Sequence, residues 1–180
     1  MKNTSMIMIT AIFITFSCAK KQDKEEMLTI PKTNYIGTEL NIDGYYYRLS
    51  ADNMGNTAYE IYFFYRDGTV LFGGFPLQSQ LFARETQFSN GEYYNQAIMS
   101  KTNWGRFQII NESIRFERWF PSSGGPARVY QQSGIILNDS TFHITTSTPS
   151  HGDGTPKVID HTYHFKKFVT KPDSVNTYTN

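Results

Sequence analysis

The stretch WGRFQIINESIRFERWF, residues Trp104 to Phe120, predicts a β-hairpin and decides the fold class. If Asn111-Glu112 is its two-residue turn, the residues that face each other across the two strands match in chemistry. The predicted pairs are Ile109 with Ile114 and Phe107 with Phe116 on one side, and Gln108 with Arg115, Arg106 with Glu117 and Trp104 with Trp119 on the other. A shift by one residue would break every pair, so the sequence predicts this register.

Further hairpins extend the pattern in both directions along the chain. Asp67-Gly68 lies between two apolar runs, and this dipeptide is a strong hairpin signal. A two-residue turn there places Tyr65 opposite Val70, Phe64 opposite Leu71 and Phe63 opposite Phe72. The remaining strand signals are GYYYRLSA (44–51), a hairpin that turns near Asn138-Asp139, and a last strand KVIDHTYHFKKF (157–168).

This meander predicts an all-β domain over residues 35–168. Six to eight antiparallel strands with short connections are typical of a sandwich or of an up-and-down barrel. We predict the eight-stranded antiparallel barrel, because closure leaves no strand edge exposed. Only one short helix is expected, near 76–88, with Pro76 in its first turn and Asn90-Gly91 after its end. Residues 92–103 carry no clear signal.

The N-terminus predicts a processing signal. Residues 1–17 contain a single cation, Lys2, and a short apolar run that is too short to span a membrane. Cys18 is the only cysteine, which excludes a disulfide within the chain. The segment Ile14 to Cys18 resembles the lipobox of bacterial lipoproteins, although Thr15 and Phe16 depart from the usual residues. The resemblance implies that Cys18 is lipidated and anchors the protein to a membrane; ordinary signal cleavage that leaves a free thiol is the alternative.

Two polar segments flank the predicted barrel. Residues 18–34 are charged and poor in aromatics, so we expect a tether, and residues 169–180 are expected to form a frayed polar tail. Lys24-Glu25-Glu26 resembles the basic-then-acidic tag that routes some lipoproteins to the outer face of the outer membrane. A solvated charge run that keeps the domain off the membrane is the alternative. The predicted location is the bacterial cell envelope, as an outer-membrane lipoprotein.

The charge balance argues against a nucleic-acid partner. The formal net charge is +1 for the whole chain, and removing Lys2 with the signal brings it to zero. A neutral chain without a basic tract lacks the electrostatic footprint that nucleic-acid binding requires.

The body of the chain resembles the lipocalin-like domains of small bacterial lipoproteins. Gly44-Tyr45-Tyr46 is similar to their opening Gly-x-Trp strand, with Tyr46 in place of the Trp, and Phe64 to Thr69 is similar to their Phe-x-x-Asp-Gly-Thr hairpin. Trp104-Gly105 and the strands after it are similar to their mid-barrel hairpin. The resemblance spans about residues 40–168 and implies a cup that binds a small hydrophobic or amphipathic molecule without catalysis. Such barrels pack a Trp against an Arg at the closed end, and this chain departs from that pattern because Tyr46 replaces the Trp.

Alternation along the strands selects the candidate ligand-binding residues. They face the predicted interior: Phe107, Ile114, Phe116, Arg118, Phe120, Phe142 and Tyr163. An inward Arg118 is costly unless it is paired or solvated, so it either holds the head group of an acidic ligand or closes the barrel against an aromatic ring. Large rings can also fill a small barrel, so the sequence leaves open whether the interior is an open cup.

The alternative function is an interaction module with a filled barrel, which binds a glycan or a protein. Trp104 and Trp119 would form its outer stacking face if they were exposed. We favour the other arrangement, in which the predicted helix or residues 92–103 cover both Trp rings. The Gly-rich loops SSGGPAR and HGDGTP are predicted at the rim of the barrel, where binding specificity often resides. The candidate rim residues are Gly124, Gly125, His151 and Asp153.

The sequence does not favour catalysis, a cofactor or a metal. It contains no G-x-S-x-G motif, and its Gly-rich loops do not lie between a strand and a helix. His161 and His164 are three apart on a predicted strand and would face opposite sides. His143 with His161 is the only histidine pair left for a metal.

Overall fold

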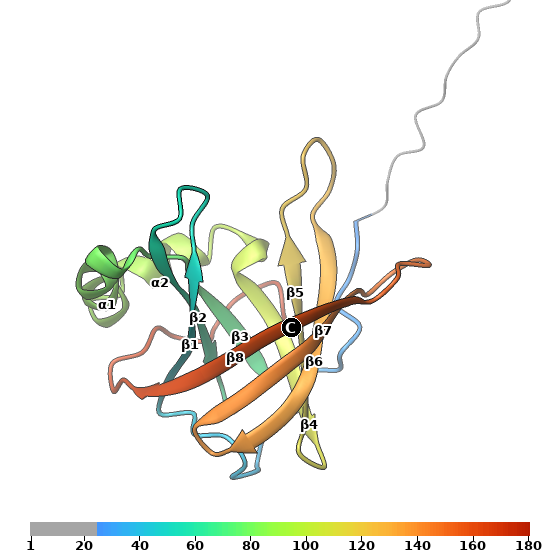
Figure 1. Cartoon of the computed structure of the whole chain (residues 1–180), viewed down its shortest axis with the longest axis horizontal. Helices are drawn as coiled ribbons and strands as arrows, with labels where there is room; N and C mark the ends of the chain where they lie inside the picture. The colour runs from blue at the N-terminus through green and yellow to red at the C-terminus, as the bar shows by residue number, and fades with distance from the viewer. Residues whose placement is uncertain (1–24) are drawn as a thin grey trace, which may run out of the picture.

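The computed structural model describes residues 25–180, which form a closed barrel of eight antiparallel strands in chain order (Figure 1). The strands are β1 (Gly44–Ala51), β2 (Thr57–Phe64), β3 (Thr69–Gly74), β4 (Trp104–Ile110), β5 (Ser113–Phe120), β6 (Arg128–Asn138), β7 (Thr141–Pro149) and β8 (Lys157–Lys167). The predicted up-and-down barrel is therefore confirmed. The predicted signal peptide, Cys18 and the first part of the tether lie outside the described residues.

The long connection from β3 to β4 is helical. It contains two short 3₁₀ turns, η1 (Gln78–Gln80) and η2 (Lys101–Asn103), and two α-helices, α1 (Leu81–Ser89) and α2 (Glu92–Ala97). The expected helix near 76–88 is thus present as η1 and α1, and part of the unassigned segment 92–103 forms α2. Phe88 of α1 packs on Tyr45 and Phe63, two outward-facing rings of the barrel, and Tyr93 of α2 packs on Phe88. These rings belong to a second hydrophobic cluster outside the barrel.

The β4–β5 hairpin has the predicted register. Phe107 pairs with Phe116, and Ile109 pairs with Ile114. Both turn residues have positive φ, 49° at Asn111 and 64° at Glu112, as a type I′ turn requires. A glutamate in this region is strained, because its Cβ crowds the backbone.

The variant Glu112→Gly is therefore expected to raise the free energy of unfolding by about 1 kcal/mol. Glycine adopts positive φ without this crowding, and the exposed Glu112 side chain is not needed for packing. Urea denaturation of both proteins measures the change. Ser113→Gly, at an exposed and regularly paired strand position, is the control and should lower the stability instead. A loss of stability in Glu112→Gly would contradict this account of the turn.

The predicted register of the β2–β3 hairpin was wrong by one residue. Phe64 pairs with Val70, Phe63 with Leu71 and Tyr62 with Phe72. The loop has three residues rather than two, because the amide of Tyr65 donates to the carbonyl of Thr69 at 3.0 Å. Gly68 has φ +82° and accommodates the extra residue as a glycine bulge.

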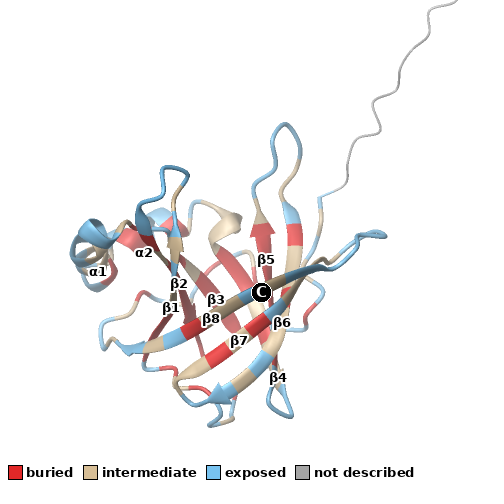
Figure 2. Cartoon of the chain, in the orientation of Figure 1, coloured by how far each residue is buried: buried red, intermediate tan, exposed pale blue. Residues whose placement is uncertain are grey.

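The lower half of the barrel is filled by aromatic rings. We call the end with the β2–β3, β4–β5 and β6–β7 turns the lower end, and the opposite end the upper end. The ring of Phe64 lies 5.0 to 5.7 Å from the rings of Tyr46, Phe107, Phe116 and Phe142. Residues 35–42 cross the lower end and add Tyr35, Leu40 and Ile42 to this cluster. Figure 2 shows buried residues alternating with more exposed ones along the strands. The barrel thus has a solid floor.

Residues 25–34 do not form the free tether that the sequence predicted. They lie against the outer face of the barrel, where Glu117 of β5 is fully buried. Its carboxylate accepts hydrogen bonds from the Ile30 amide at 2.5 Å and from the Thr29 hydroxyl at 2.9 Å. The indole of Trp119 donates to the carbonyl of Glu26 at 2.7 Å. These contacts could not be predicted from the charged sequence, because two of the three use backbone groups of the segment.

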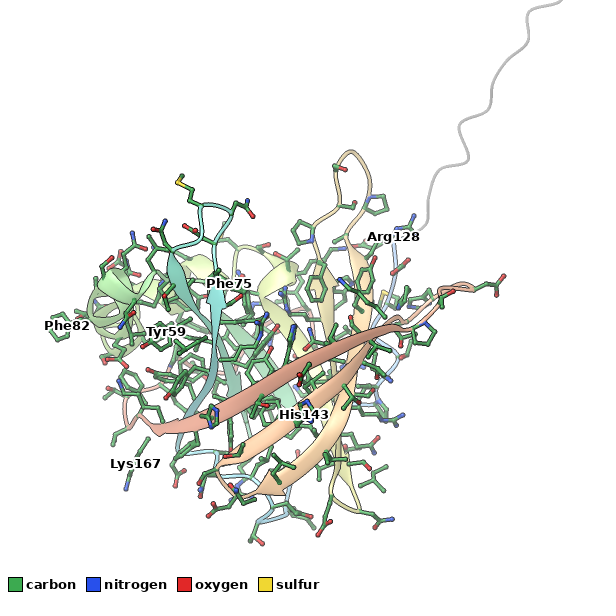
Figure 3. The ribbon with its side chains drawn as sticks, in the orientation of Figure 1. Tyr59, Phe75, Phe82, Arg128, His143 and Lys167 are labelled. Carbon is green, nitrogen blue, oxygen red and sulfur yellow. The ribbon has the colours of Figure 1, made fainter. Side chains whose placement is uncertain are left out.

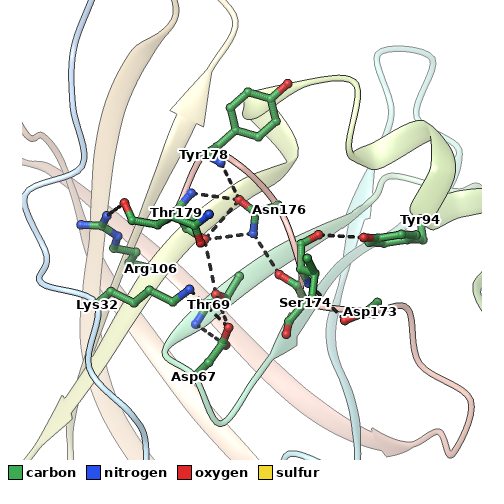
Figure 4. Close-up of polar contacts among 12 residues, drawn as sticks. Lys32, Asp67, Thr69, Tyr94, Arg106, Asp173, Ser174, Asn176, Tyr178 and Thr179 are labelled. Carbon is green, nitrogen blue, oxygen red and sulfur yellow. Dashed lines mark hydrogen bonds and ion pairs between the residues drawn. The ribbon is translucent and has the colours of Figure 1, made fainter.

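The C-terminal segment is ordered by contacts, and the expectation of a frayed tail was wrong. Thr179 is fully buried, and its hydroxyl lies 3.4 Å from the hydroxyl of Thr69 (Figure 4). Asn176 donates from Nδ2 to the Thr179 hydroxyl and accepts from the Thr179 amide, both at 2.9 Å. The hydroxyl of Tyr94 donates to the carbonyl of Val175. A polar tail can therefore be buried when its polar groups satisfy one another.

The predicted ion pair between Arg106 and Glu117 does not form, although the two residues are aligned. Arg106 instead donates to the carbonyl oxygens of Ile30 and Asn180, so it joins the N-terminal and C-terminal segments to β4.

Lys171 fixes the start of the C-terminal segment at the lower end. Its ammonium group donates to the carbonyl oxygens of Ile42 and Phe64 and lies 4.1 Å from the centre of the Tyr65 ring. Burial lowers the pKa of Lys171 to about 8, from an ordinary value of 10.5.

This depressed pKa predicts that stability rises with pH above about 8. Between pH 8 and 10.5 the unfolded chain holds a proton on Lys171 that the folded chain has released, so the free energy of unfolding increases with pH. Below about pH 8 the folded chain bears the full free-energy cost of burying the charged ammonium group, and this cost disappears as the pH rises from about 8 to 10.5. Urea denaturation from pH 7.5 to 9.5, below the range where tyrosines ionise, should show a rise in the wild type that Lys171→Met lacks. If the free energy of unfolding changed with pH in the same way in both proteins, Lys171 would not be the cause of the rise.

Candidate functional site

The upper half of the barrel interior contains a connected polar network. Glu60 of β2 is at its centre, with Oε2 2.5 Å from Nε of Arg48 on β1. The hydroxyl of Tyr163 donates to the same carboxylate at 2.8 Å, and that of Tyr62 donates to it at 3.1 Å. Nε of Arg118 donates to the Tyr62 hydroxyl at 3.2 Å. Four strands thus bring five polar side chains into one water-poor volume.

Arg118 is the unusual member of this network. It is 6% exposed, and its guanidinium carbon lies 4.0 Å from the ring centre of Phe72 and 3.7 Å from that of Phe120. Its other hydrogen bonds run from Nη1 to the carbonyl oxygens of Thr102 and Trp119. Within residues 25–180 its hydrogen bonds go to neutral groups only, and no carboxylate pairs with it. A buried cation is normally paired with an anion, because desolvation disfavours an isolated charge.

The network carries an excess of positive charge. Arg48 and Arg118 are two cations against the single carboxylate of Glu60. Burial raises the pKa of Tyr62 and of Tyr163, so both phenols stay neutral hydrogen-bond donors. Burial, followed by the nearby charge of Arg48, lowers the pKa of His161, so its imidazole is neutral at pH 7. The interior therefore favours a group with a negative charge.

Two further interior side chains have polar atoms without partners. Oε1 of Gln132 on β6 and Nδ1 of His161 on β8 are both buried and make no hydrogen bond to residues 25–180. Buried polar atoms normally have a partner, and an exception points to a water molecule or a ligand.

The polar network comes nearest to solvent at the upper end of the barrel, which we call the mouth. Along β6, exposure rises from buried Gln132 to half-buried Tyr130 and exposed Arg128, which lies at the upper end in Figure 3. Along β8 it rises from buried Tyr163 to half-buried Ile159. The predicted rim residues Gly124, Gly125, His151 and Asp153 lie in the β5–β6 and β7–β8 loops at this end.

The structure places every predicted ligand-binding residue inside the barrel. Some of these residues belong to the floor, and the others lie above it. The residues that belong to the filled floor or its upper surface are Phe107, Ile114, Phe116, Phe142 and Tyr163. Arg118 and Phe120 lie above them, near the mouth. Sequence reasoning missed Arg48, Glu60 and Gln132, although Arg48 and Glu60 occupy inward positions that alternation from Tyr46 and Tyr62 could have identified.

Trp104 and Trp119 do face outward, but neither is exposed. Trp104 is fully buried under α2, and its indole donates to the carbonyl of Ala97 at 2.9 Å. Trp119 is 3% exposed beneath the N-terminal segment. An exposed Trp stacking face is therefore wrong, and the covered arrangement is the one present.

The histidines do not gather into a metal site. His143 faces outward, with Nε2 2.7 Å from a carboxylate oxygen of Asp160, whereas His161 faces inward. The remaining His143–His161 pair is thus separated by the wall of the barrel. Across residues 25–180, no three His, Cys, Asp or Glu side chains lie close enough together to hold a metal ion. The same residues include no helix with the length and hydropathy to cross a membrane.

Two hollows on the outside of the barrel, each of about 630 Å³, are weaker candidates for a site. One lies beside Lys171 at the lower end, where Lys171 and Arg66 already donate to backbone carbonyls. The other crosses β4, β5 and β6, where Arg115 donates to Gln108. The cations named in both hollows therefore already have hydrogen-bond partners within the protein.

Comparison with protein-family models, with curated proteins and with solved structures finds no match to this chain. Any functional argument therefore depends on the chemistry of the upper interior.

Proposed function

We propose that the protein is a lipid-anchored lipoprotein of the cell envelope whose lipocalin-like barrel binds a small amphipathic ligand without catalysis. The observation that carries this proposal is Arg118, a buried cation inside the barrel with no carboxylate partner among the described residues. A ligand with an anionic head group would supply that partner. A purely hydrophobic ligand is less well supported, because aromatic rings fill the floor of the barrel.

Arg118 suits a carboxylate or a similar oxyanion. The guanidinium group presents several donors in a plane, and the stacked rings of Phe72 and Phe120 hold that plane in place. Its known bonds use Nε and Nη1, so Nη2 can donate to an incoming anion. In a site with little water the attraction between opposite charges is several times stronger than in bulk solvent.

The apolar part of the ligand would extend from Arg118 toward the mouth. Half-buried apolar side chains line this path: Phe72, Phe120, Tyr130 and Ile159. Each methylene that they remove from water would contribute about 0.8 kcal/mol.

The proposed anchor is consistent with access from a membrane. The described chain begins at the upper end, where Glu25 pairs with Lys101 and Glu26 with Arg128. Cys18 and Glu25 are seven steps apart along the chain, with six residues between them, and such a length spans at most about 25 Å. A lipid on Cys18 would therefore keep the mouth of the barrel near the membrane surface, where amphipathic molecules are concentrated.

Calorimetric titration tests the ligand proposal. The chain from residue 19 onward, which lacks the anchor, would be titrated with decanoate and with decanol, two ligands that share a chain and differ in charge. We expect decanoate to bind at least tenfold more tightly than decanol. Equal affinities, or no binding of decanoate, would refute an anionic head group at Arg118.

Mass analysis tests the anchor separately. The N-terminal peptide of protein purified from bacterial membranes should carry acyl groups on Cys18, and Cys18→Ser should release the protein into the soluble fraction. An unmodified Cys18 in the membrane fraction would refute the lipoprotein assignment without affecting the ligand site.

A further inference from the structure

The side-chain amide of Gln132 is buried in the barrel interior and has an acceptor atom that is unpaired within the described chain. Gln132 is 7% exposed and faces the barrel interior, since it pairs with Phe116 on β5. Its Oε1 has no partner within residues 25–180. A buried acceptor without a hydrogen bond is unfavourable, so a donor is expected to reach it.

His161 presents a second unsatisfied atom to the same interior. It precedes Tyr163 by two residues on β8, so both side chains face inward. Its Nδ1 is buried without a partner in the described chain. A neutral imidazole can accept a hydrogen bond through one ring nitrogen and donate through the other.

Both atoms lie in the half of the barrel that contains Arg118. Arg118 pairs with Tyr130 across β5 and β6, and Gln132 is the next inward-facing residue of β6 after Tyr130. Gln132 is therefore a diagonal neighbour of Arg118, at a separation of about 7–8 Å between Cα atoms. His161 lies on β8, two residues before the Tyr163 that donates to Glu60, and the charges of Arg48 and Glu60 act on it.

We propose that the ligand carries, near its anionic group, a hydroxyl that donates to Oε1 of Gln132 and accepts from the Nδ1–H of His161. This inference rests on the proposed function and narrows the ligand to hydroxylated acidic amphiphiles. A hydroxyl suits a primary amide and an imidazole because it both donates and accepts. A site built with such partners rejects an analogue that lacks the polar group, because its own buried atoms then stay unpaired.

Paired titrations of matched ligands test the inference. The wild-type chain from residue 19 onward would be titrated with decanoate and with each enantiomer of 3-hydroxydecanoate. We expect one hydroxylated enantiomer to bind at least tenfold more tightly than decanoate. In Gln132→Leu this preference should fall to twofold or less, while the affinity for decanoate is maintained.

Gln131→Leu is the matched control, because Gln131 is the adjacent residue on β6 and bonds outside the barrel to Ser133. It should keep the preference of the wild type. His161→Phe is a second variant of the site and should weaken the preference at least threefold. Thermal unfolding of each variant checks that the barrel remains folded.

The outcomes separate the two proposals. If neither decanoate nor 3-hydroxydecanoate binds the wild type, the proposed function fails. If both bind with equal affinity, the inference is overturned while the proposed function stands. A preference that persists in both Gln132→Leu and His161→Phe also overturns the inference.

Discussion

Replacement of Arg118 by Met is expected to weaken decanoate binding at least 100-fold and to leave the barrel as stable as the wild type or more so. The loss in binding follows because Arg118 is the one interior cation whose charge is not balanced by a carboxylate in the described chain. A 100-fold change corresponds to about 2.7 kcal/mol, within the range of a charge-assisted pair that is shielded from water. Stability should not fall, because an apolar side chain of similar length avoids the burial of an unpaired charge.

Arg115→Met is the matched control for this prediction. Arg115 lies on the same strand, faces outward and donates to Gln108. Calorimetry should show unchanged decanoate affinity in this variant, and urea denaturation should show that both variants are folded. Undiminished binding by Arg118→Met would show that the head group lies elsewhere, and a stability loss above about 3 kcal/mol would show that Arg118 is chiefly structural.

Replacement of Phe64 by Ala is expected to lower the free energy of unfolding by about 3–5 kcal/mol. The Phe64 side chain is 1% exposed and contacts four other rings in the floor of the barrel. Its removal leaves a cavity that strands joined in a closed barrel cannot easily collapse. Urea denaturation measures the change.

Phe82→Ala provides the comparison, since Phe82 lies on α1 and is 82% exposed (Figure 3). Its effect on the free energy of unfolding should be under about 0.5 kcal/mol. A loss below about 1 kcal/mol for Phe64→Ala would mean that the floor is loosely packed, and a chain could then enter the lower half of the barrel.

The fold could be predicted because its signals are local. The β4–β5 hairpin combines a two-residue turn with matched cross-strand pairs, so a single register satisfies it. The β2–β3 hairpin carries the Asp-Gly signal but adopts a three-residue loop, and the sequence does not distinguish these two forms by composition alone.

The candidate site could be predicted only in part. Arg118 was identified because it interrupts a row of inward apolar residues on β5. The terminal segments were misjudged, because half-buried Glu26 accepts from the amide of Val129 and buried Thr179 lies against Thr69, and both partners are far away in the chain. Such contacts leave no periodic signal. The network of Arg48, Glu60 and Tyr163 likewise exists only once the barrel closes β8 against β1.

The measurement that tests the central claim most directly is an NMR titration of the arginine Nε–Hε signals with decanoate. The account predicts a saturable shift of the Arg118 signal, a smaller shift for Arg48 and none for Arg115. Assignment follows from the loss of one signal in each Arg→Met variant. Shifts confined to arginines on the outer surface, or an Arg118 signal that does not move at saturating decanoate, would contradict a ligand site in the upper half of the barrel.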